Sequence, residues 1–119
     1  MKDGIQLITE ERIRQLCKEG WTDEHDDTHD MGELRRAGAA YALAANAGPD
    51  ALIPASWPWS QRWWKPSADP IRNLVKGGAL IAAEIDRLQR KKGYRAPPPD
   101  RPYFDVREAH AKAGYPDNR

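Results

Sequence analysis

Apolar residues recur at helical spacing most clearly between residues 69 and 92 of the chain. The repeating positions are Ile71, Leu74, Val75, Gly78, Ile81, Ala82, Ile85 and Leu88. Asp69 suits a helix N-cap, Pro70 suits the first helical position, and Gly93 follows a basic last turn. The pattern therefore predicts a helix of about six turns over residues 69–92, with this apolar stripe buried.

Two further segments follow the same period. Residues 28–47 repeat small or apolar side chains until Gly48 and Pro49 end the pattern. The repeating positions are Leu34, Ala37, Tyr41, Ala44 and Ala45. The segment ITEERIRQLCKEG predicts a first helix, with Thr9 as its N-cap and Gly20 at its end. Three helices are thus expected in the first 93 residues, with one further short candidate around DVREAHAKAG in the tail.

Two adjacent glycines interrupt the long helix. Gly77 and Gly78 each cost about 1 kcal/mol relative to alanine in a helix interior, so they need a packing reason. Close approach of the alanine- and glycine-rich face of residues 28–47 would supply it. We therefore predict an all-α fold built on an antiparallel pair, residues 28–47 and 69–92, packed with the first helix. So thin an interface leaves a small stability margin, which favours a homodimer.

The segment IPASWPWSQRWWKPS connects the two helices of this pair and holds four of the five tryptophans. Pro54, Pro58 and Pro66 exclude a regular helix, so an irregular connector is predicted. Its candidate binding residues are Trp57, Trp59, Arg62, Trp63, Trp64 and Lys65. Aromatic faces beside basic groups can stack nucleobases and hold phosphates. The alternative is a lid in which these indoles, with Trp21, close off a thin core.

The stretch EHDDTHDMGE, residues 24–33, concentrates carboxylates and histidines. Its metal-ligand candidates, taken with one carboxylate of the long helix, are His25, His29, Asp30, Glu33 and Glu84. On a continuous helix the two histidines and Glu33 would share one face, and such a set can hold magnesium for nucleotide phosphate hydrolysis. Two alternatives stay open. Asp27 with Asp30 can cap a helix start, or the stretch can form an acidic patch that faces a partner.

Composition narrows the class of protein. At 119 residues the chain suits one domain, expected at residues 1–93, with a proline-rich C-terminal extension at 94–119. Nineteen bases against eighteen acids give a net charge of +1, which argues against duplex DNA as a partner. The single cysteine, Cys17, suits a reducing cytoplasm. Since no apolar run reaches the roughly 18 residues that span a bilayer, no membrane partner is expected.

Three segments in order, ITEERIRQLCKEGWTDEHDDTHDMGELRRAGAAYALAA, WPWSQRWWKP and RNLVKGGALIAAEIDRL, carry a family resemblance. They resemble a small uncharacterised family common in tailed phages and prophages, over roughly residues 8 to 90. The resemblance implies a phage accessory gene that acts in the cytoplasm of the infected bacterium. Such genes often encode inhibitors of host defence, nucleotide-handling proteins or nucleic-acid accessory factors.

A second similarity is to the MazG-like all-α nucleotide pyrophosphohydrolases. These enzymes bind magnesium through ExxE and ExxD pairs on antiparallel helices. The nearest counterparts here are Asp30 with Glu33 and Glu84 with Arg87, and Arg87 stands where a carboxylate is needed.

We therefore expect a non-enzymatic phage binding protein, without a cofactor, that modulates a host process by engaging a protein or a nucleotide-like ligand. The rival hypothesis is a magnesium-dependent nucleotide pyrophosphohydrolase, and the third is single-stranded nucleic-acid binding.

Overall fold

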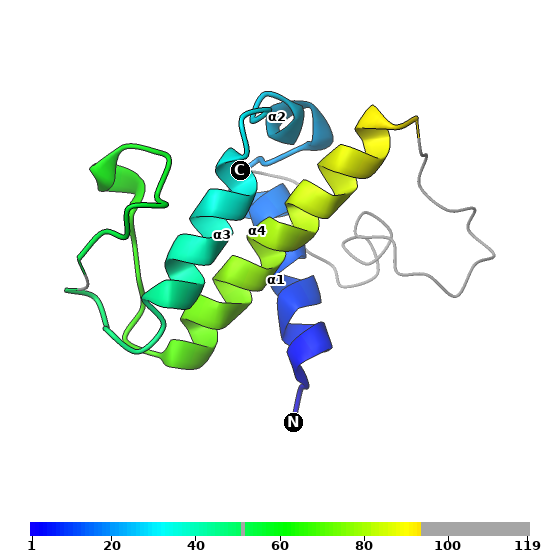
Figure 1. The fold of residues 1–119 in the computed structure, drawn as a ribbon. Coiled ribbons are helices and arrows are strands. Elements are labelled where there is room, and N and C mark those ends of the chain that lie inside the picture. Colours follow the sequence, from blue (N-terminus) through cyan, green and yellow to red (C-terminus); the bar gives the residue numbers. More distant parts are fainter. Residues whose placement is uncertain (51, 94–119) are drawn as a thin grey trace.

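A computed structural model describes residues 1–50 and 52–93, and the predicted C-terminal extension lies outside them. The described part is helical and contains no strand, which confirms the all-α prediction. Its elements are α1 (Gly4–Lys18), α2 (Asp23–Asp27), α3 (Glu33–Leu43), the 3-10 helix η1 (Gln61–Trp63) and α4 (Pro70–Lys91). Figure 1 shows α3 and α4 side by side, α1 across α4, and α2 near the C-terminal end of α4. Within the described residues, no helix is long and apolar enough to cross a membrane.

The ends of α4 follow from its sequence. The Asp69 carboxylate accepts a hydrogen bond from the Ile71 backbone N–H at 2.9 Å, and Pro70 occupies the first turn. After the basic last turn the chain leaves the helix at Gly93, whose φ is +85°. Each of these local signals confirms the boundary predicted from the sequence.

The pairing of α3 with α4 is antiparallel and close. Arg35 near the start of α3 binds Glu84 late in α4, whereas the carbonyl of Ala45, just after α3, accepts from Asn73 early in α4. Midway, a Cβ placed on Gly38 would lie 2.9 Å from the Gly77 carbonyl oxygen, so the two backbones meet. The packing reason predicted for both glycines is confirmed for Gly77, whereas Gly78 faces the Ile8 side chain of α1 instead.

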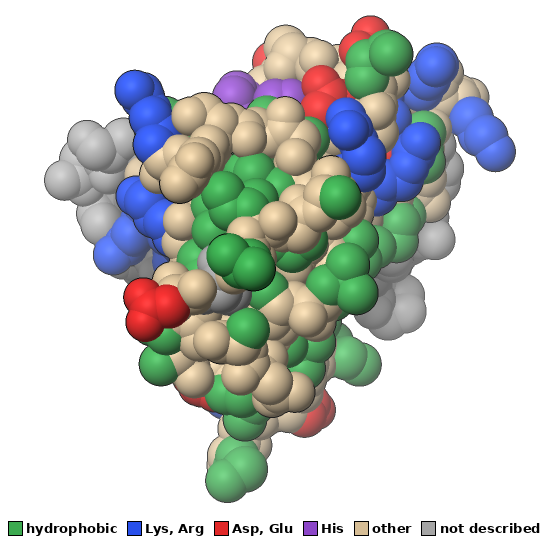
Figure 2. Space-filling model, turned by 60° about the vertical axis from the view of Figure 1, so that its left-hand side comes forward, with side chains coloured by type: hydrophobic (Ala, Val, Ile, Leu, Met, Phe, Trp, Pro, Cys, Tyr) green, Lys and Arg blue, Asp and Glu red, His purple; other side chains and the backbone are tan. Residues whose placement is uncertain are grey.

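The core between these helices is small. Leu34, Ala37, Tyr41, Leu80 and Ala83 form its buried cluster. Trp21 and three connector tryptophans are partly buried and pack against that cluster. These four indoles therefore form the predicted lid, whereas Trp63 is 53% exposed. Figure 2, in which the connector side of the molecule is turned forward, shows hydrophobic side chains gathered in the middle of this face.

The predicted start of the first helix is wrong. The helix α1 begins at Gly4, five residues before Thr9, because Asp3 and Gln6 form a capping box. The Asp3 carboxylate accepts from the Gln6 N–H at 2.9 Å, and the Gln6 amide oxygen accepts from the Asp3 N–H at 2.9 Å. This reciprocal pair outweighs a single threonine cap.

The predicted continuous helix over residues 28–47 is also wrong at its start. The chain forms the five-residue α2, turns, and begins α3 only after Gly32, whose φ of +78° breaks the helix. Consequently the acidic stretch does not present one continuous helical face. Thr22 caps α2 instead of a carboxylate, and Asp27 binds Arg90 of α4 at 2.8 Å.

The apolar stripe predicted to be buried along α4 is mostly exposed. Its exposed members are Ile71, Leu74, Ile81, Ile85 and Leu88. The buried positions of α4 are instead Asn73, Val75, Gly77, Ala79, Leu80, Ala83, Glu84 and Arg87. Small residues allow the close backbone approach, and the buried polar groups find partners: Asn73 donates to Ala45, and Glu84 binds Arg87.

Candidate aromatic pocket

A cavity of about 510 Å³ lies among α1, the turn that follows it, α2, α3, α4 and the connector. We call it the aromatic pocket. Its lining residues are Glu11, Arg14, Gln15, Glu19, Trp21, His25, Asp26, His29, Leu34, Tyr41, Trp57, Trp59, Ser60, Trp63, Lys65, Lys76 and Leu80. Segments that are far apart in the sequence thus converge on one site. Among them are ERIRQ, EGWTDEHDDTH and WPWSQRWWK.

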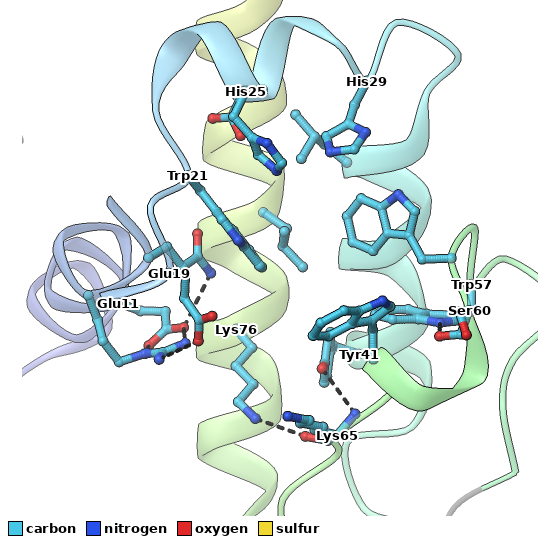
Figure 3. Close-up of a pocket in the computed structure, with 17 residues that line it drawn as sticks. Glu11, Glu19, Trp21, His25, His29, Tyr41, Trp57, Ser60, Lys65 and Lys76 are labelled. Atoms are coloured by element: carbon cyan, nitrogen blue, oxygen red, sulfur yellow. Dashed lines mark hydrogen bonds and ion pairs between the residues drawn. The ribbon is translucent and has the colours of Figure 1, made fainter. Parts of the chain in front are cut away.

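Aromatic rings form two opposing sides of the pocket. Figure 3 shows Trp21 and His25 on one side and Tyr41 with Trp57 on the other. The Trp21 and His25 rings lie nearly parallel, with centroids 6.5 Å apart. Tyr41 and Trp57 meet edge to face at 5.6 Å. The open space between the two sides is bounded mainly by flat, apolar surfaces.

A few hydrogen bonds shape the connector and attach it to α3. Within the connector, the Trp57 backbone N–H donates to the Pro54 carbonyl in a turn, and Ser60 caps η1. At the end of the segment the Lys65 N–H donates to the Tyr41 hydroxyl at 3.4 Å. Burial raises the pKa of Tyr41, so its hydroxyl stays protonated as part of this contact.

One end of the pocket carries two lysines. Lys76 of α4 donates from Nζ to the Lys65 carbonyl at 2.9 Å, and its ammonium lies 5.4 Å from the centre of the Tyr41 ring. In the described part of the chain neither lysine ammonium has an ion-pair partner. Burial, aided by the charge of Arg72, lowers the pKa of Lys76. An anion bound at this end would offset that cost.

An ion-pair network borders the pocket beside α1. Glu11 is buried and accepts from Arg14 at 2.8 and 2.9 Å and from Arg72 at 2.6 Å. Burial alone would raise the pKa of Glu11, but the two guanidinium groups outweigh it and lower that pKa. Arg14 also binds Glu19 at 2.9 Å. The network fixes this border of the pocket. Its carboxylates, Glu11 and Glu19, are already paired with arginines.

Below the histidines, Asp26 is only 1% exposed. Its nearest base is Arg12, and the 3.9 Å between Arg12 Nη1 and Asp26 Oδ2 is too long for a hydrogen bond. Neither carboxylate oxygen has a hydrogen-bond partner. Burial raises the pKa of Asp26 to about 6, against the opposing charges of Arg12 and Arg90. The ionised form of Asp26 is therefore destabilised by burial at the edge of the pocket.

The predicted metal ligands are only partly brought together. His25 and His29 have ring centroids 5.1 Å apart, and His29 Nδ1 lies 3.8 Å from Glu33 Oε2. Burial and the neighbouring His25 lower the pKa of His29. Glu33 Oε1, in turn, accepts from the Met31 N–H at 2.6 Å.

Glu84 does not fit a magnesium site. Its two oxygens accept from Arg87 Nε and Arg35 Nη1, each at 2.7 Å. Over residues 1–50 and 52–93, no three His, Cys, Asp or Glu side chains are grouped so that they could hold a metal ion. The arginines occupy the place that a cation would need.

The predicted binding residues divide into two groups. Trp57, Trp59, Trp63 and Lys65 line the pocket. The other two predicted residues, Arg62 and Trp64, do not: the Arg62 guanidinium lies over the Trp63 ring at 4.8 Å, and the Trp64 ring packs 4.9 Å from that of Tyr41. Trp57 and Trp59 therefore both pack against the core and line the pocket.

Sequence reasoning missed several lining residues as site residues. Tyr41 was assigned to the core stripe, and Lys76 falls between the apolar positions of α4 without a distinguishing pattern. Asp26 belongs to the acidic stretch, but its burial depends on α1 and α4. Trp21 carried a usable signal, because an indole buries a large apolar area and this one was expected to join the lid over the core.

The fold and the site together define a small all-α protein with an aromatic-walled pocket that is basic at one end. Comparison of the chain with protein-family models, with curated proteins and with solved structures finds no match.

Proposed function

We propose that this chain is a non-enzymatic binding protein whose aromatic pocket takes a nucleotide-like ligand. The observation that supports this most is the combination of opposing aromatic sides with the two lysines at one end. A planar base would stack between Trp21 and Trp57, and its phosphate would lie against Lys65 and Lys76. The cavity of about 510 Å³ falls in the size range of small-ligand sites.

The cellular role in this proposal comes from the resemblance to tailed-phage proteins. A phage protein that sequesters or senses a nucleotide in the infected cell would modulate a host process, and inhibition of host defence is one such process. Binding requires no cofactor in this proposal. The occupied carboxylate of Glu84 favours binding over the magnesium-dependent hydrolysis of the rival hypothesis.

Ligand binding is tested by tryptophan fluorescence and calorimetry with adenosine, guanosine, cytidine and uridine monophosphates, each beside its nucleoside. We expect quenching by at least one monophosphate. Lys76→Gln should weaken that monophosphate about tenfold while leaving its nucleoside unchanged, because it removes one charge-assisted contact. Lys92→Gln, the same change at an exposed position away from the pocket, should alter neither affinity.

Three results would overturn the proposal. The first is that no monophosphate or nucleoside binds to the full chain at millimolar concentration. The second is equal weakening by Lys76→Gln and Lys92→Gln, which would indicate nonspecific attraction. The third is magnesium-dependent release of pyrophosphate from nucleoside triphosphates that Glu33→Ala abolishes, which would establish the hydrolase instead. Binding to oligonucleotides alone, with a steep salt dependence, would favour the single-strand hypothesis.

A further inference from the structure

One face of α4 carries a row of exposed apolar side chains along the helix. We call this row the outer face; it consists of Ile71, Leu74, Ile81, Ile85 and Leu88. These side chains are 39% to 60% exposed. A helix that is apolar on both faces is normally covered on both. On the inner face α3 and α1 provide that cover. On the outer face they reach only the middle of the row, at Ile81 and Gly78, and the described residues leave the rest of it exposed.

The spacing of the outer face is that of a coiled-coil seam. With Gly78 included, its positions are separated by three, four, three, four and three residues, which is the a and d pattern of a heptad repeat. The row extends along nearly the whole of the 22-residue helix, about 33 Å at 1.5 Å per residue. The buried residues of α4 lie outside this row, so their packing does not account for the repeat.

The same spacing is self-complementary in an antiparallel pair. A two-fold axis between residues 79 and 80 places Leu74 opposite Ile85 of a second copy and Ile71 opposite its Leu88. At the Gly78 position the side chain of Ile8 from α1 lies over the helix, since its Cδ1 is 2.7 Å from where a Gly78 Cβ would stand. Ile8 therefore takes the place of a side chain at this position of the row, and it would lie opposite Ile81 of the second copy. Such mutual contacts are those of an isologous dimer.

Charge selects the antiparallel orientation. At the end of α4 Lys91 and Lys92 are exposed bases, whereas Arg90 is already ion-paired with α2. A parallel pair would bring these bases together, at a cost from like-charge repulsion. An antiparallel pair places them near Asp69, the N-cap of the other α4, and opposes the two helix dipoles.

From these features we infer that the protein forms a symmetric homodimer through the outer face, with the two α4 helices antiparallel. The interface is a single helix seam, at the small end of stable interfaces, so a dissociation constant on the order of 10 µM is expected. The aromatic pocket is not part of this face, so the dimer and the ligand site are independent.

Sedimentation velocity of the full chain between 5 and 200 µM tests the dimer. The wild type should change from monomer to dimer over this range, whereas Leu74→Glu and Ile85→Lys should each remain monomeric throughout. Both side chains are about half exposed, so the monomer should keep its helical circular dichroism. Leu43→Glu is the matched control, because Leu43 is 75% exposed at the end of α3 and lies off the seam.

The antiparallel orientation of the two α4 helices is tested by combining the Leu74→Glu and Ile85→Lys substitutions. In an antiparallel dimer position 74 meets position 85, so a mixture of Leu74→Glu and Ile85→Lys chains should recover dimers. The double variant should dimerise as well. In a parallel dimer each position meets itself, and the double variant should stay monomeric. A wild type that is monomeric at 200 µM, singles that still dimerise, or a failure of the mixture to recover dimers would each overturn the inference.

Discussion

Replacing Asp26 by asparagine should stabilise the protein near neutral pH. The side chain is buried without a hydrogen-bond partner, and burial raises its pKa to about 6 from an ordinary value of 3.8. Arg12 and Arg90 oppose this rise and the neighbouring Asp23 and Asp27 add to it. Asparagine has the shape of the protonated acid and carries no charge, so it removes the cost of ionisation and keeps the packing.

The magnitude follows from the two pKa values. Because the folded state holds the proton more tightly, the stabilising contribution of protonated Asp26 is complete below pH 3.8 and is lost as the pH rises through about 6. At pH 7.5 the ionised carboxylate therefore costs roughly 3 kcal/mol. Asp26→Asn should recover most of that free energy at pH 7.5 and almost none at pH 3.5.

Urea unfolding followed by circular dichroism measures this difference at both pH values. The comparison is between variant and wild type at each pH, so the titration of other groups cancels to first order. Asp30→Asn is the control, because Asp30 is exposed and its replacement should change the free energy of unfolding by less than about 0.5 kcal/mol at either pH. Destabilisation by Asp26→Asn at pH 7.5 would refute the reasoning and would mean that Arg12 requires the negative charge.

Two further predictions concern packing. Gly38→Ala should destabilise the protein by about 1–3 kcal/mol in thermal unfolding, because the new Cβ would meet the Gly77 carbonyl at 2.9 Å. Gly78→Ala should change the stability by less than about 1 kcal/mol, since only the movable Ile8 side chain lies in the way. Equal effects of the two would contradict the close backbone approach. Asn73→Leu should cost about 2–4 kcal/mol in urea unfolding, because it leaves the N–H and carbonyl of Ser67 and the carbonyl of Ala45 without partners; an unchanged midpoint would mean that water replaces the amide.

Sequence reasoning succeeded where the signal is local. The cap at Asp69, the proline at the first position of α4 and the glycine contact at Gly77 depend on a few neighbouring atoms or on the known cost of glycine. It failed where two local signals compete. Thr9 and Asp3 are both good caps, and the side chain of Gln6 decides in favour of Asp3.

The prediction that the apolar stripe of α4 is buried failed for a different reason. An apolar stripe was assumed to face the protein's own core, but the core face is the one that allows close approach and pairs its polar groups, as Glu84 does with Arg87. The pocket could not be predicted for a similar reason. Tyr41, Lys76 and Trp21 come from three segments whose meeting depends on the tertiary fold. The connector tryptophans could be predicted as lining residues because four of the five tryptophans lie in one short segment.

Ion pairs to α4 attach the short helix α2, which carries His25 of the aromatic pocket. Five residues are too few to persist as an isolated helix, and Arg90 holds this one by ion pairs to Asp23 at 3.3 Å and Asp27 at 2.8 Å. Both carboxylates are open to solvent, so dissolved salt weakens these bonds. Higher ionic strength should therefore weaken the attachment of α2 to α4, and with it the placement of His25 at the edge of the aromatic pocket.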